Sequence, residues 1–261
     1  MNKLYVVSTP IGNIKDITER AKETLQNVNV VLAEDTRNTE KLFSLIGIKN
    51  KIISLHKWNE NEKTETVLKY LEEGEVALVS DAGTPTISDP GQFLISSLME
   101  KGVEIVSVPG ASALIAALSI SGIKYKSFSF IGFLPKKENQ LIELIEENNS
   151  DVLIGYESPN RIKKTLETLE KNNNSLNVTI AREITKKFEE VLKGKPSELK
   201  GKDYKGEIVI MIETPKQEDD KLKEKVSLMK EMKLSNKDII TYLTKYDGYK
   251  KNDIYEELKD E

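Results

Sequence analysis

The feature that most constrains the fold is a regular alternation of short apolar segments with longer amphipathic ones over the first half of the chain. Apolar segments of strand length occupy residues 4–8, 28–33, 52–55, 76–80 and 103–108. Segments with helical periodicity follow them at residues 17–26, 39–45, 62–72, 93–100 and 113–119. Strands that alternate with helices in this way form parallel sheets covered by helices. The pattern therefore predicts an α/β domain with a parallel sheet over residues 1–121.

The alternation changes after Gly122, where strands continue with fewer helices between them. Five further apolar segments lie at residues 128–133, 152–156, 178–182, 189–192 and 208–212. Only about two clear helical segments accompany these strands, which indicates that some of the connections are direct. We therefore predict a second α/β domain with a mixed sheet over residues 122–215.

The last part of the chain, residues 216–261, is rich in Lys and Glu and has helical periodicity. Ser235 followed by Asp238 resembles a capping box at the start of a helix. Asp247 and Gly248 separate two short amphipathic segments, as a turn between helices would. The pattern predicts a small helical tail, either a helix-turn-helix of the kind that binds nucleic acid or a plain helical hairpin.

Composition excludes several classes of chemistry. The chain has no Cys and a single His, His56. Thiolate nucleophiles, disulfides, zinc sites built from Cys and metal sites rich in His are therefore excluded, and we expect no metal and a cytoplasmic location. No apolar run approaches the length of a membrane span, so we expect no membrane partner. The formal net charge is −4 at pH 7, so any binding to nucleic acid must come from local basic patches.

Turn-forming residues gather where three of the predicted strands end. They are Pro10, Gly12 and Asn13 after the first strand, Asp81, Ala82, Gly83 and Thr84 after the fourth, and Gly110, Ala111 and Ser112 after the fifth. Ligands of open α/β sheets bind at the carboxyl ends of the strands, where small residues let the backbone approach closely. The alternative is a set of ordinary turns, with Asp89 capping a helix whose first residue is Pro90.

Charged residues follow other strand ends. Glu34, Asp35 and Arg37 come after the second strand, Arg161 follows Tyr156 and Glu157, and Arg182, Glu183 and Lys186 lie together. Arg suits phosphate recognition, so these segments could line a surface that faces a polyanion; surface ion pairs and helix caps are the alternative. Adjacent side chains of an extended strand point to opposite sides. One of Glu34 and Asp35 should therefore face the site, and the other should cap a helix that begins near Thr36.

Taken in order, the motifs resemble one family. The chain contains T-P-I-G-N, A-E-D-T-R, S-D-A-G-T-P-T-I-S-D-P-G, V-P-G-A-S-A, G-F-L-P, Y-E-S-P-N-R, R-E-I-T-K-K-F-E-E and K-G-E-I-V. This run resembles the ribosomal RNA small subunit methyltransferase I family, within the tetrapyrrole-methylase superfamily. The absence of any G-x-G turn agrees with it, because dinucleotide folds and Rossmann-type methyltransferases usually have such a turn after the first strand.

The resemblance implies a two-domain tetrapyrrole-methylase-like fold and a homodimer. It also implies transfer of a methyl group from S-adenosylmethionine (SAM) to a cytidine 2′-hydroxyl at the decoding centre of 16S ribosomal RNA, the expected partner. The residues expected to bind SAM are the ten strand-end residues named above, together with Tyr156, Ala181, Gly206 and Glu207. Those expected to hold the RNA are Arg37, Arg161, Arg182 and Lys186.

The acceptor hydroxyl needs a proton acceptor, and carboxylates are the candidates because the chain has no His pair and no Cys. We expect this base to be Asp35 or Glu34, with Glu183 as the next candidate. The family usually has a second His where this chain has Trp58, and another His at the position of Asn160, so neither can act here. Two alternatives are a tetrapyrrole C-methyltransferase and a non-catalytic RNA-binding factor for ribosome assembly.

Overall fold

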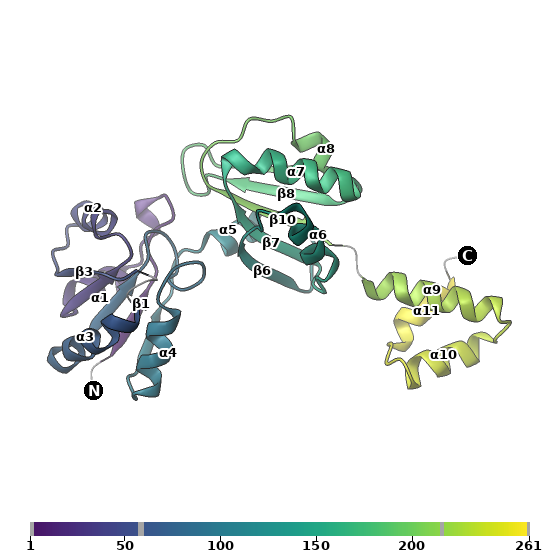
Figure 1. Cartoon of the computed structure of the whole chain (residues 1–261), viewed down its shortest axis with the longest axis horizontal. Coiled ribbons are helices and arrows are strands. Elements are labelled where there is room, and N and C mark those ends of the chain that lie inside the picture. The colour runs from purple at the N-terminus through teal and green to yellow at the C-terminus, as the bar shows by residue number, and fades with distance from the viewer. Residues whose placement is uncertain (1–2, 57–59, 215–216, 260–261) are drawn as a thin grey trace.

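The first half of the molecule is a five-stranded parallel sheet. A computed structural model describes residues 3–56, 60–214 and 217–259. The strands are β1 (Leu4–Val7), β2 (Val30–Ala33), β3 (Ile52–Ser54), β4 (Val76–Val79) and β5 (Ile105–Val108), in the order β3-β2-β4-β1-β5. All pairings between them are parallel. Figure 1 labels β1 and β3 of this sheet. The predicted parallel sheet is confirmed, and its central strands β2 and β4 are buried along their whole length.

Helices cover both faces of this sheet. They are α1 (Glu19–Asn27), α2 (Thr36–Ile46), α3 (Glu60–Glu73) and α4 (Gln92–Glu100); the 3₁₀ helix η1 (Ile14–Asp16) follows β1, and α5 (Ala113–Ile120) follows β5. One core contains Leu25 of α1 and Phe43 of α2, and the other contains Leu71 of α3 and Leu94 of α4. Apolar residues of successive strands point to alternate faces and so supply both cores.

The alternative in which Asp89 caps the helix after β4 is wrong, whereas the predicted helix at residues 93–100 is confirmed. Helix α4 begins at Gln92, and its N-cap is Gly91 with a φ of 118°. Asp89 is therefore not the cap, and Pro90 is not the first helical residue. With Gly91 as the cap, Asp89 belongs to the loop after β4 and not to the start of α4.

The second sheet is mixed, as predicted. Its strands are β6 (Phe128–Phe133), β7 (Val152–Glu157), β8 (Asn177–Arg182), β9 (Glu190–Gly194) and β10 (Ile208–Glu213), in the order β6-β7-β10-β8-β9. Strands β6 and β7 run parallel, whereas the other pairs are antiparallel. Its helices are α6 (Glu138–Glu146), α7 (Pro159–Asn173) and the short α8 (Pro196–Leu199).

The two sheets are joined through α5. The helices α6 and α7 bury Leu141 and Leu166 against one face of the second sheet. Leu114 and Ala117 of α5 pack against the other face, where they share a core with Ile11, Val209 and Met211. Figure 1 shows α5 between the two halves of the molecule. This packing sets the carboxyl edge of the first sheet against the second.

The tail forms three helices, α9 (Gln217–Glu231), α10 (Asn236–Lys245) and α11 (Lys251–Lys259). They have a core of their own, built around Leu222, Ile239 and Ile254. Ser235 caps α10 as predicted, since its hydroxyl accepts a hydrogen bond from the Asp238 amide. The predicted boundary at residues 121 and 122 falls just after α5. The boundary at 215 and 216 lies outside the described residues, as does Trp58, and both boundaries stay predictions.

Within the described ranges, none of the helices combines the length and the apolar character needed to cross a membrane.

Candidate active site between the two sheets

The turns after β1, β4 and β5 interlock at the carboxyl edge of the first sheet. Thr9 and Gly83 pair through their backbones, with N–O distances of 2.9 and 3.1 Å. The Ser8 and Thr84 hydroxyls lie 2.9 Å apart, and Thr84 Oγ1 donates to the Ala111 carbonyl at 3.1 Å. Gly83 has a φ of 85°, a backbone conformation that favours glycine. These turns meet because their strands are neighbours in the sheet.

A cleft of about 430 Å³ opens between these turns and the second sheet. We call it the inner cleft. Apolar side chains including Ile11, Ile184 and Val209 form part of its wall, among polar groups of the strand-end turns. Eight of the residues predicted to bind the cofactor line it, namely Asp81, Ala82, Gly83, Thr84, Ser112, Tyr156, Gly206 and Glu207. A mainly apolar cleft with a few polar groups suits a nucleoside-sized ligand.

Six predicted cofactor residues lie outside this lining: Pro10, Gly12, Asn13, Gly110, Ala111 and Ala181. Two of them contact the second half instead. The Asn13 amide donates to Thr185 Oγ1 at 3.1 Å, and a Cβ on Gly12 would lie 2.5 Å from Lys186 Cγ. These residues hold the β1 turn against the loop after β8; direct binding of the cofactor by them stays a prediction.

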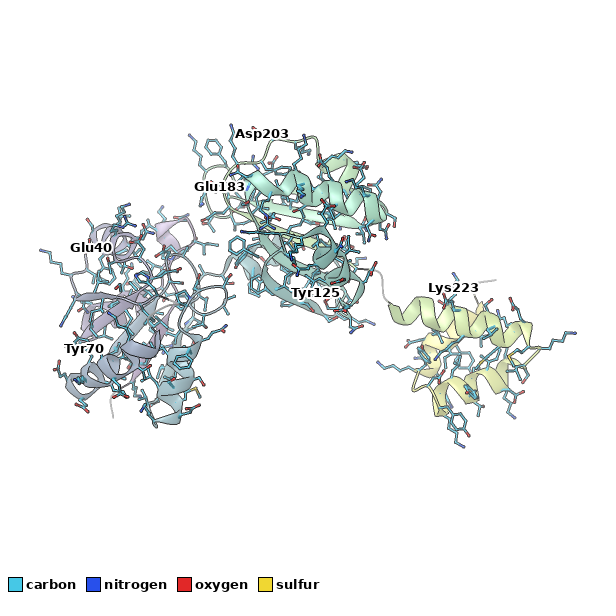
Figure 2. The ribbon with its side chains drawn as sticks, viewed as in Figure 1. Glu40, Tyr70, Tyr125, Glu183, Asp203 and Lys223 are labelled. Carbon is cyan, nitrogen blue, oxygen red and sulfur yellow. The ribbon has the colours of Figure 1, made fainter. Side chains whose placement is uncertain are left out.

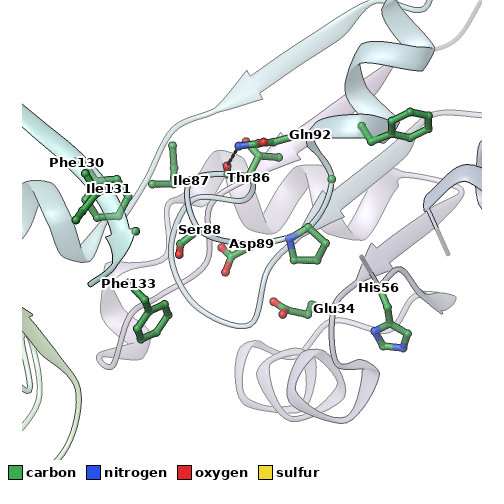
Figure 3. Close-up of a pocket in the computed structure, with 14 residues that line it drawn as sticks. Glu34, His56, Thr86, Ile87, Ser88, Asp89, Gln92, Phe130, Ile131 and Phe133 are labelled. Carbon is green, nitrogen blue, oxygen red and sulfur yellow. Dashed lines mark hydrogen bonds between the residues drawn. The ribbon is translucent and has the colours of Figure 1, made fainter. Parts of the chain in front are cut away.

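A second opening adjoins the inner cleft, and we call it the outer hollow. It has a volume of about 1010 Å³ and is lined by the loop of residues 86–93, by residues 130–133 of β6, and by Glu34 and His56. Figure 3 shows Glu34, Asp89 and Phe133 around the same space. The two openings share these three residues and also Ile87 and Ser88, so they are continuous.

Phe133 stands at the junction of the two openings. It is 61% exposed, although it belongs to a strand. The register of β6 against β7 shifts between Phe130 and Phe133, and Gly132 has a φ of 70°. Such a bulge redirects a side chain. The Phe133 ring lies 5.7 Å from that of Tyr156, edge to face.

Two carboxylates at this junction have raised pKa values. Burial raises the pKa of Glu34, and the nearby Asp89 and Asp81 raise it further. Burial also raises the pKa of Asp89, which Asp81 raises further and a hydrogen bond with Ser80 lowers. A carboxylate whose pKa moves toward neutrality becomes a stronger proton acceptor. Asp89 was missed as a site residue because a helix cap explained it; its place in a long loop at a strand end was the available signal.

The neighbouring Asp35 has a different role. It is the N-cap of α2, where its Oδ1 accepts a hydrogen bond from the Arg37 amide at 2.9 Å. Arg37 also pairs with Asp35 Oδ2 at 2.7 Å, and these hydrogen bonds lower the pKa of Asp35 to about 2. Asp35 lines neither the inner cleft nor the outer hollow. The two adjacent carboxylates therefore have the different surroundings that were predicted: Glu34 lines the two openings, and Asp35 caps α2.

Asp81 also accepts hydrogen bonds from the start of α2. Its carboxylate accepts from the Asp35 amide at 3.1 Å and from Asn38 Nδ2 at 2.9 Å. It therefore ties the β4 turn to the start of α2, and the next residues of that turn, Ala82 and Gly83, line the inner cleft.

Glu183 supports the turn that closes the cleft from the second half. Its Oε1 accepts from Lys186 Nζ at 2.9 Å and from the Glu207 amide at 3.0 Å. The bond with Lys186 and that with the Glu207 backbone lower the pKa of Glu183. Figure 2 labels Glu183 in the second half of the molecule. A carboxylate held in this way is a weak proton acceptor, and it does not line either opening.

The predicted RNA-binding cations are mostly engaged within the protein. Arg161 donates to the Leu134 carbonyl at 2.8 Å and pairs with the buried Glu157 at 3.2 Å. Arg182 pairs with Glu190, and Lys186 pairs with Glu183 and Glu207. The Arg37 side chain is 81% exposed. Among the described residues, no group of three or more acidic or His side chains could hold a metal ion.

Comparison with known proteins places this site in a family. The sequence profile of the tetrapyrrole (corrin/porphyrin) methylases matches residues 3–200. A protein of Pasteurella multocida called ribosomal RNA small subunit methyltransferase I is 40% identical over 269 residues, which cover 97% of this chain and 95% of that protein. The chain belongs to the ribosomal RNA small subunit methyltransferase I family of the tetrapyrrole methylases.

Other members and solved structures agree with the family. Proteins of the same name from Halalkalibacterium halodurans and Thermotoga maritima are 42% and 43% identical, over 80% and 76% of this chain and 75% and 90% of theirs. A diphthine synthase matches with a TM-score of 0.64 at 15% identity, over 82% of this chain and 90% of that one. The Thermus thermophilus uroporphyrin-III C-methyltransferase complexed with S-adenosylhomocysteine has a TM-score of 0.59 at 16% identity, over 80% and 97%. The structural similarity over most of the chain shows that it has the tetrapyrrole-methylase fold.

Proposed function

We propose that this protein transfers the methyl group of SAM to the 2′-hydroxyl of a cytidine in the 16S RNA of the small ribosomal subunit. The observation that carries the proposal is the similarity over nearly the whole chain to ribosomal RNA small subunit methyltransferase I, at 40% identity. The continuous inner cleft and outer hollow support it, because methyl transfer needs two ligands that meet at one point.

The inner cleft suits SAM. The turn at 81–84 and the turn at Gly206 and Glu207 both line it and offer polar groups, and Ile11 and Ile184 offer apolar contact. A Cβ on Gly83 would lie 3.2 Å from Ile11 Cγ2, so a side chain there would crowd this wall. When bound, SAM would supply an electrophilic methyl group on a sulfonium. Predicted cofactor residues outside the lining would act by holding these turns in place.

The outer hollow suits the acceptor nucleotide. A base drawn out of the RNA could stack on the exposed Phe133 ring, and such stacking is sequence-tolerant. The Asp89 carboxylate could accept a hydrogen bond from the cytosine amino group, which is the usual pairing of an acidic side chain with cytosine. This pair of contacts would place the ribose next to the junction with the inner cleft.

Glu34 is the proposed proton acceptor. With SAM and the nucleotide bound, Glu34 would accept the proton that the 2′-hydroxyl loses when it takes the methyl group. Its raised pKa makes this carboxylate a stronger base than an exposed one. Arg37, whose side chain is largely exposed beside this site, is the proposed phosphate contact. To bind a phosphate, Arg37 would exchange its side-chain bonds with Asp35. Arg161, Arg182 and Lys186 also have internal partners, and the same role for them stays a prediction.

An assay with labelled SAM tests the function. Small ribosomal subunits from a strain that lacks the enzyme should accept about one methyl group each, and mapping should place it on a cytidine ribose. A porphyrinogen offered in parallel tests the tetrapyrrole alternative, and SAM binding by titration tests the assembly-factor alternative. Methylation of the porphyrinogen alone, or absence of SAM binding, would contradict the proposal.

A homodimer in the cytoplasm is proposed as well. Small ribosomal subunits are cytoplasmic, and apolar side chains are exposed along α5 and up to the start of β6, namely Ile115, Ile120, Tyr125 and Phe128. Burial of such a group in a symmetric interface would stabilise a dimer. Light scattering should give twice the chain mass of 29.5 kDa, and a single chain mass at micromolar protein would contradict it.

A further inference from the structure

The three-helix tail has its charges separated along the chain. Between residues 233 and 252 the sequence has five lysines and two aspartates, whereas acidic residues concentrate at 218–224 and 253–261. One of the two aspartates, Asp247, pairs with Lys225 of α9 at 2.7 Å. The other, Asp238, accepts from the Ser235 hydroxyl at the start of α10. The segment with α10 and the turn into α11 is therefore basic, although the whole chain is acidic.

The basic side chains meet at a surface hollow of about 590 Å³. Lys237 and Lys245 of α10 and Lys251 and Tyr255 of α11 line it. We call these four residues the basic face. The three lysines are exposed, and within the described part of the chain they form no ion pair. Gly248, with a φ of 76°, makes the tight turn that sets α11 beside α10.

Aromatic rings lie next to the lysines. Tyr242, Tyr246 and Tyr255 are 48%, 66% and 48% exposed. The Tyr242 and Tyr246 rings are 5.2 Å apart, and Lys245 Nζ lies 5.2 Å from the Tyr246 ring. Exposed rings interleaved with lysines can stack on bases while the ammonium groups contact phosphates.

We propose that the basic face binds RNA of the small ribosomal subunit, and that the tail thereby acts as a second anchor for the substrate. The inference rests on the proposed function for the identity of the RNA. The physical argument is charge complementarity between unpaired lysines and a polyanion. A second anchor compensates for the active-site half, where Arg161, Arg182 and Lys186 are held by internal partners. It raises the effective concentration of the substrate at the inner cleft.

The test compares two triple variants of the full chain. One is Lys237→Gln, Lys245→Gln and Lys251→Gln. The other is a control with the same charge change at exposed lysines elsewhere, Lys69→Gln, Lys171→Gln and Lys223→Gln, of which Lys223 is labelled on α9 in Figure 2. Binding to naked 16S RNA and to small subunits is measured from 50 to 200 mM salt. SAM affinity, melting temperature and methylation kinetics are measured on the same samples.

The basic-face variant should bind naked 16S RNA at least about tenfold more weakly than the control. The slope of log affinity against log salt should be smaller in magnitude by roughly 2–3, since each lost phosphate contact lowers this slope by about 0.7–0.9. KM for small subunits should rise, while SAM affinity and melting temperature stay unchanged. Equal affinity and salt slope in the two variants would overturn the inference. Weaker binding to subunits with unchanged binding to naked RNA would overturn it too, because the contact would then be to a ribosomal protein.

The proposed function has a separate outcome in this experiment. If the unmodified protein and the control methylate small subunits and the basic-face variant binds RNA normally, only the inference fails. If none of them methylates small subunits, the proposed function fails, and the RNA-binding curves still decide whether the basic face binds RNA.

Discussion

At the scale of residues, two adjacent carboxylates have opposite surroundings. Glu34 lines the inner cleft and the outer hollow, where burial and neighbouring carboxylates raise its pKa. Asp35 caps α2, and its bonds with Arg37 lower its pKa to about 2. Because the strand alternates its side chains, a difference of one position separates the proposed proton acceptor from a helix cap.

Glu34→Gln should lower the single-turnover rate of methyl transfer by at least about a hundredfold, the lower range for loss of a general base. SAM affinity should be kept. In the unmodified protein the rate should fall as the pH drops through the raised pKa of Glu34, since only the carboxylate accepts a proton. Asp35→Asn is the matched control and should keep most of the rate. Near-native rates in Glu34→Gln would assign the proton elsewhere, with Asp89 as the next candidate.

Asp35→Ala should lower the melting temperature by about 2–4 °C at neutral pH, because α2 loses its cap. The folded-state pKa of Asp35 lies below its ordinary value of 3.8. Its contribution is therefore present above that value and lost as the pH falls toward about 2. Melting curves at neutral and acidic pH should show that the difference in melting temperature between the unmodified protein and Asp35→Ala becomes smaller as the pH falls. A difference in melting temperature that becomes larger would contradict this prediction.

Phe133→Ala should lower kcat/KM for small subunits by about 5- to 150-fold, which corresponds to the 1–3 kcal/mol lost with one stacked base. Phe133→Tyr should retain activity because it keeps the ring. Phe188 is similarly exposed, at 64% against 61%, and lines neither opening, so Phe188→Ala is the control. Because Phe133 also borders the inner cleft, SAM affinity must be measured in parallel. A loss explained wholly by weaker SAM binding would remove the base-stacking role.

At the scale of elements, the site depends on a turn that has no room for a side chain. Gly206 has a φ of 80°, and a Cβ there would lie 2.2 Å from Glu183 Cδ. Glu183 is itself held by Lys186 and by the Glu207 amide. The turn before β10 and the loop after β8 therefore form one unit, which closes the inner cleft from the side of the second sheet.

Gly206→Ala should weaken SAM binding and lower the melting temperature, because the new methyl group displaces Glu183 and strains a left-handed backbone. Gly201→Ala is the matched control, since a Cβ at Gly201 would have no neighbour within 4 Å. Calorimetric titration with SAM and melting curves compare the two. Equal SAM affinity in both variants would mean that the Gly206 turn does not contribute to the cofactor site.

At the scale of the whole molecule, the inner cleft is built from both halves. Its lining includes Asp81 and Ser112 from the first half, and Tyr156 and Glu207 from the second. The halves are also joined by α5 and by the hydrogen bond from Asn13 to Thr185. A ligand in this cleft should therefore stabilise the two halves together.

SAM at a hundred times its Kd should stabilise the folded protein by about 2.7 kcal/mol. We expect both sheets to melt in one transition under this condition. The affinity should be the same with and without a chelator, because the described residues contain no cluster that could hold a metal. Calorimetric titration with SAM, with and without the chelator, compares the two affinities. Loss of binding in the chelator would show that a metal takes part.

The amino-acid sequence by itself determined the local structure and the location of the site. Its apolar runs placed all ten strands of the two sheets, since short runs between turn-forming residues have few other ways to bury their side chains. Small and acidic residues after β1, β2, β4 and β5 indicated the edge of the sheet where the candidate site lies, because parallel strands bring their carboxyl ends together. The motifs also carried the resemblance to the family.

Tertiary structure alone decided which of these residues do what. Arg161 contacts the Leu134 carbonyl, 27 positions earlier in the chain, and is occupied there. Asp89 leaves the helix start and reaches the junction of the two openings, because Gly91 caps α4. The bulge in β6 turns Phe133 toward the same junction. These three features depend on contacts between residues distant in sequence or on a single left-handed backbone angle. Periodicity along the chain reveals neither such contacts nor such angles.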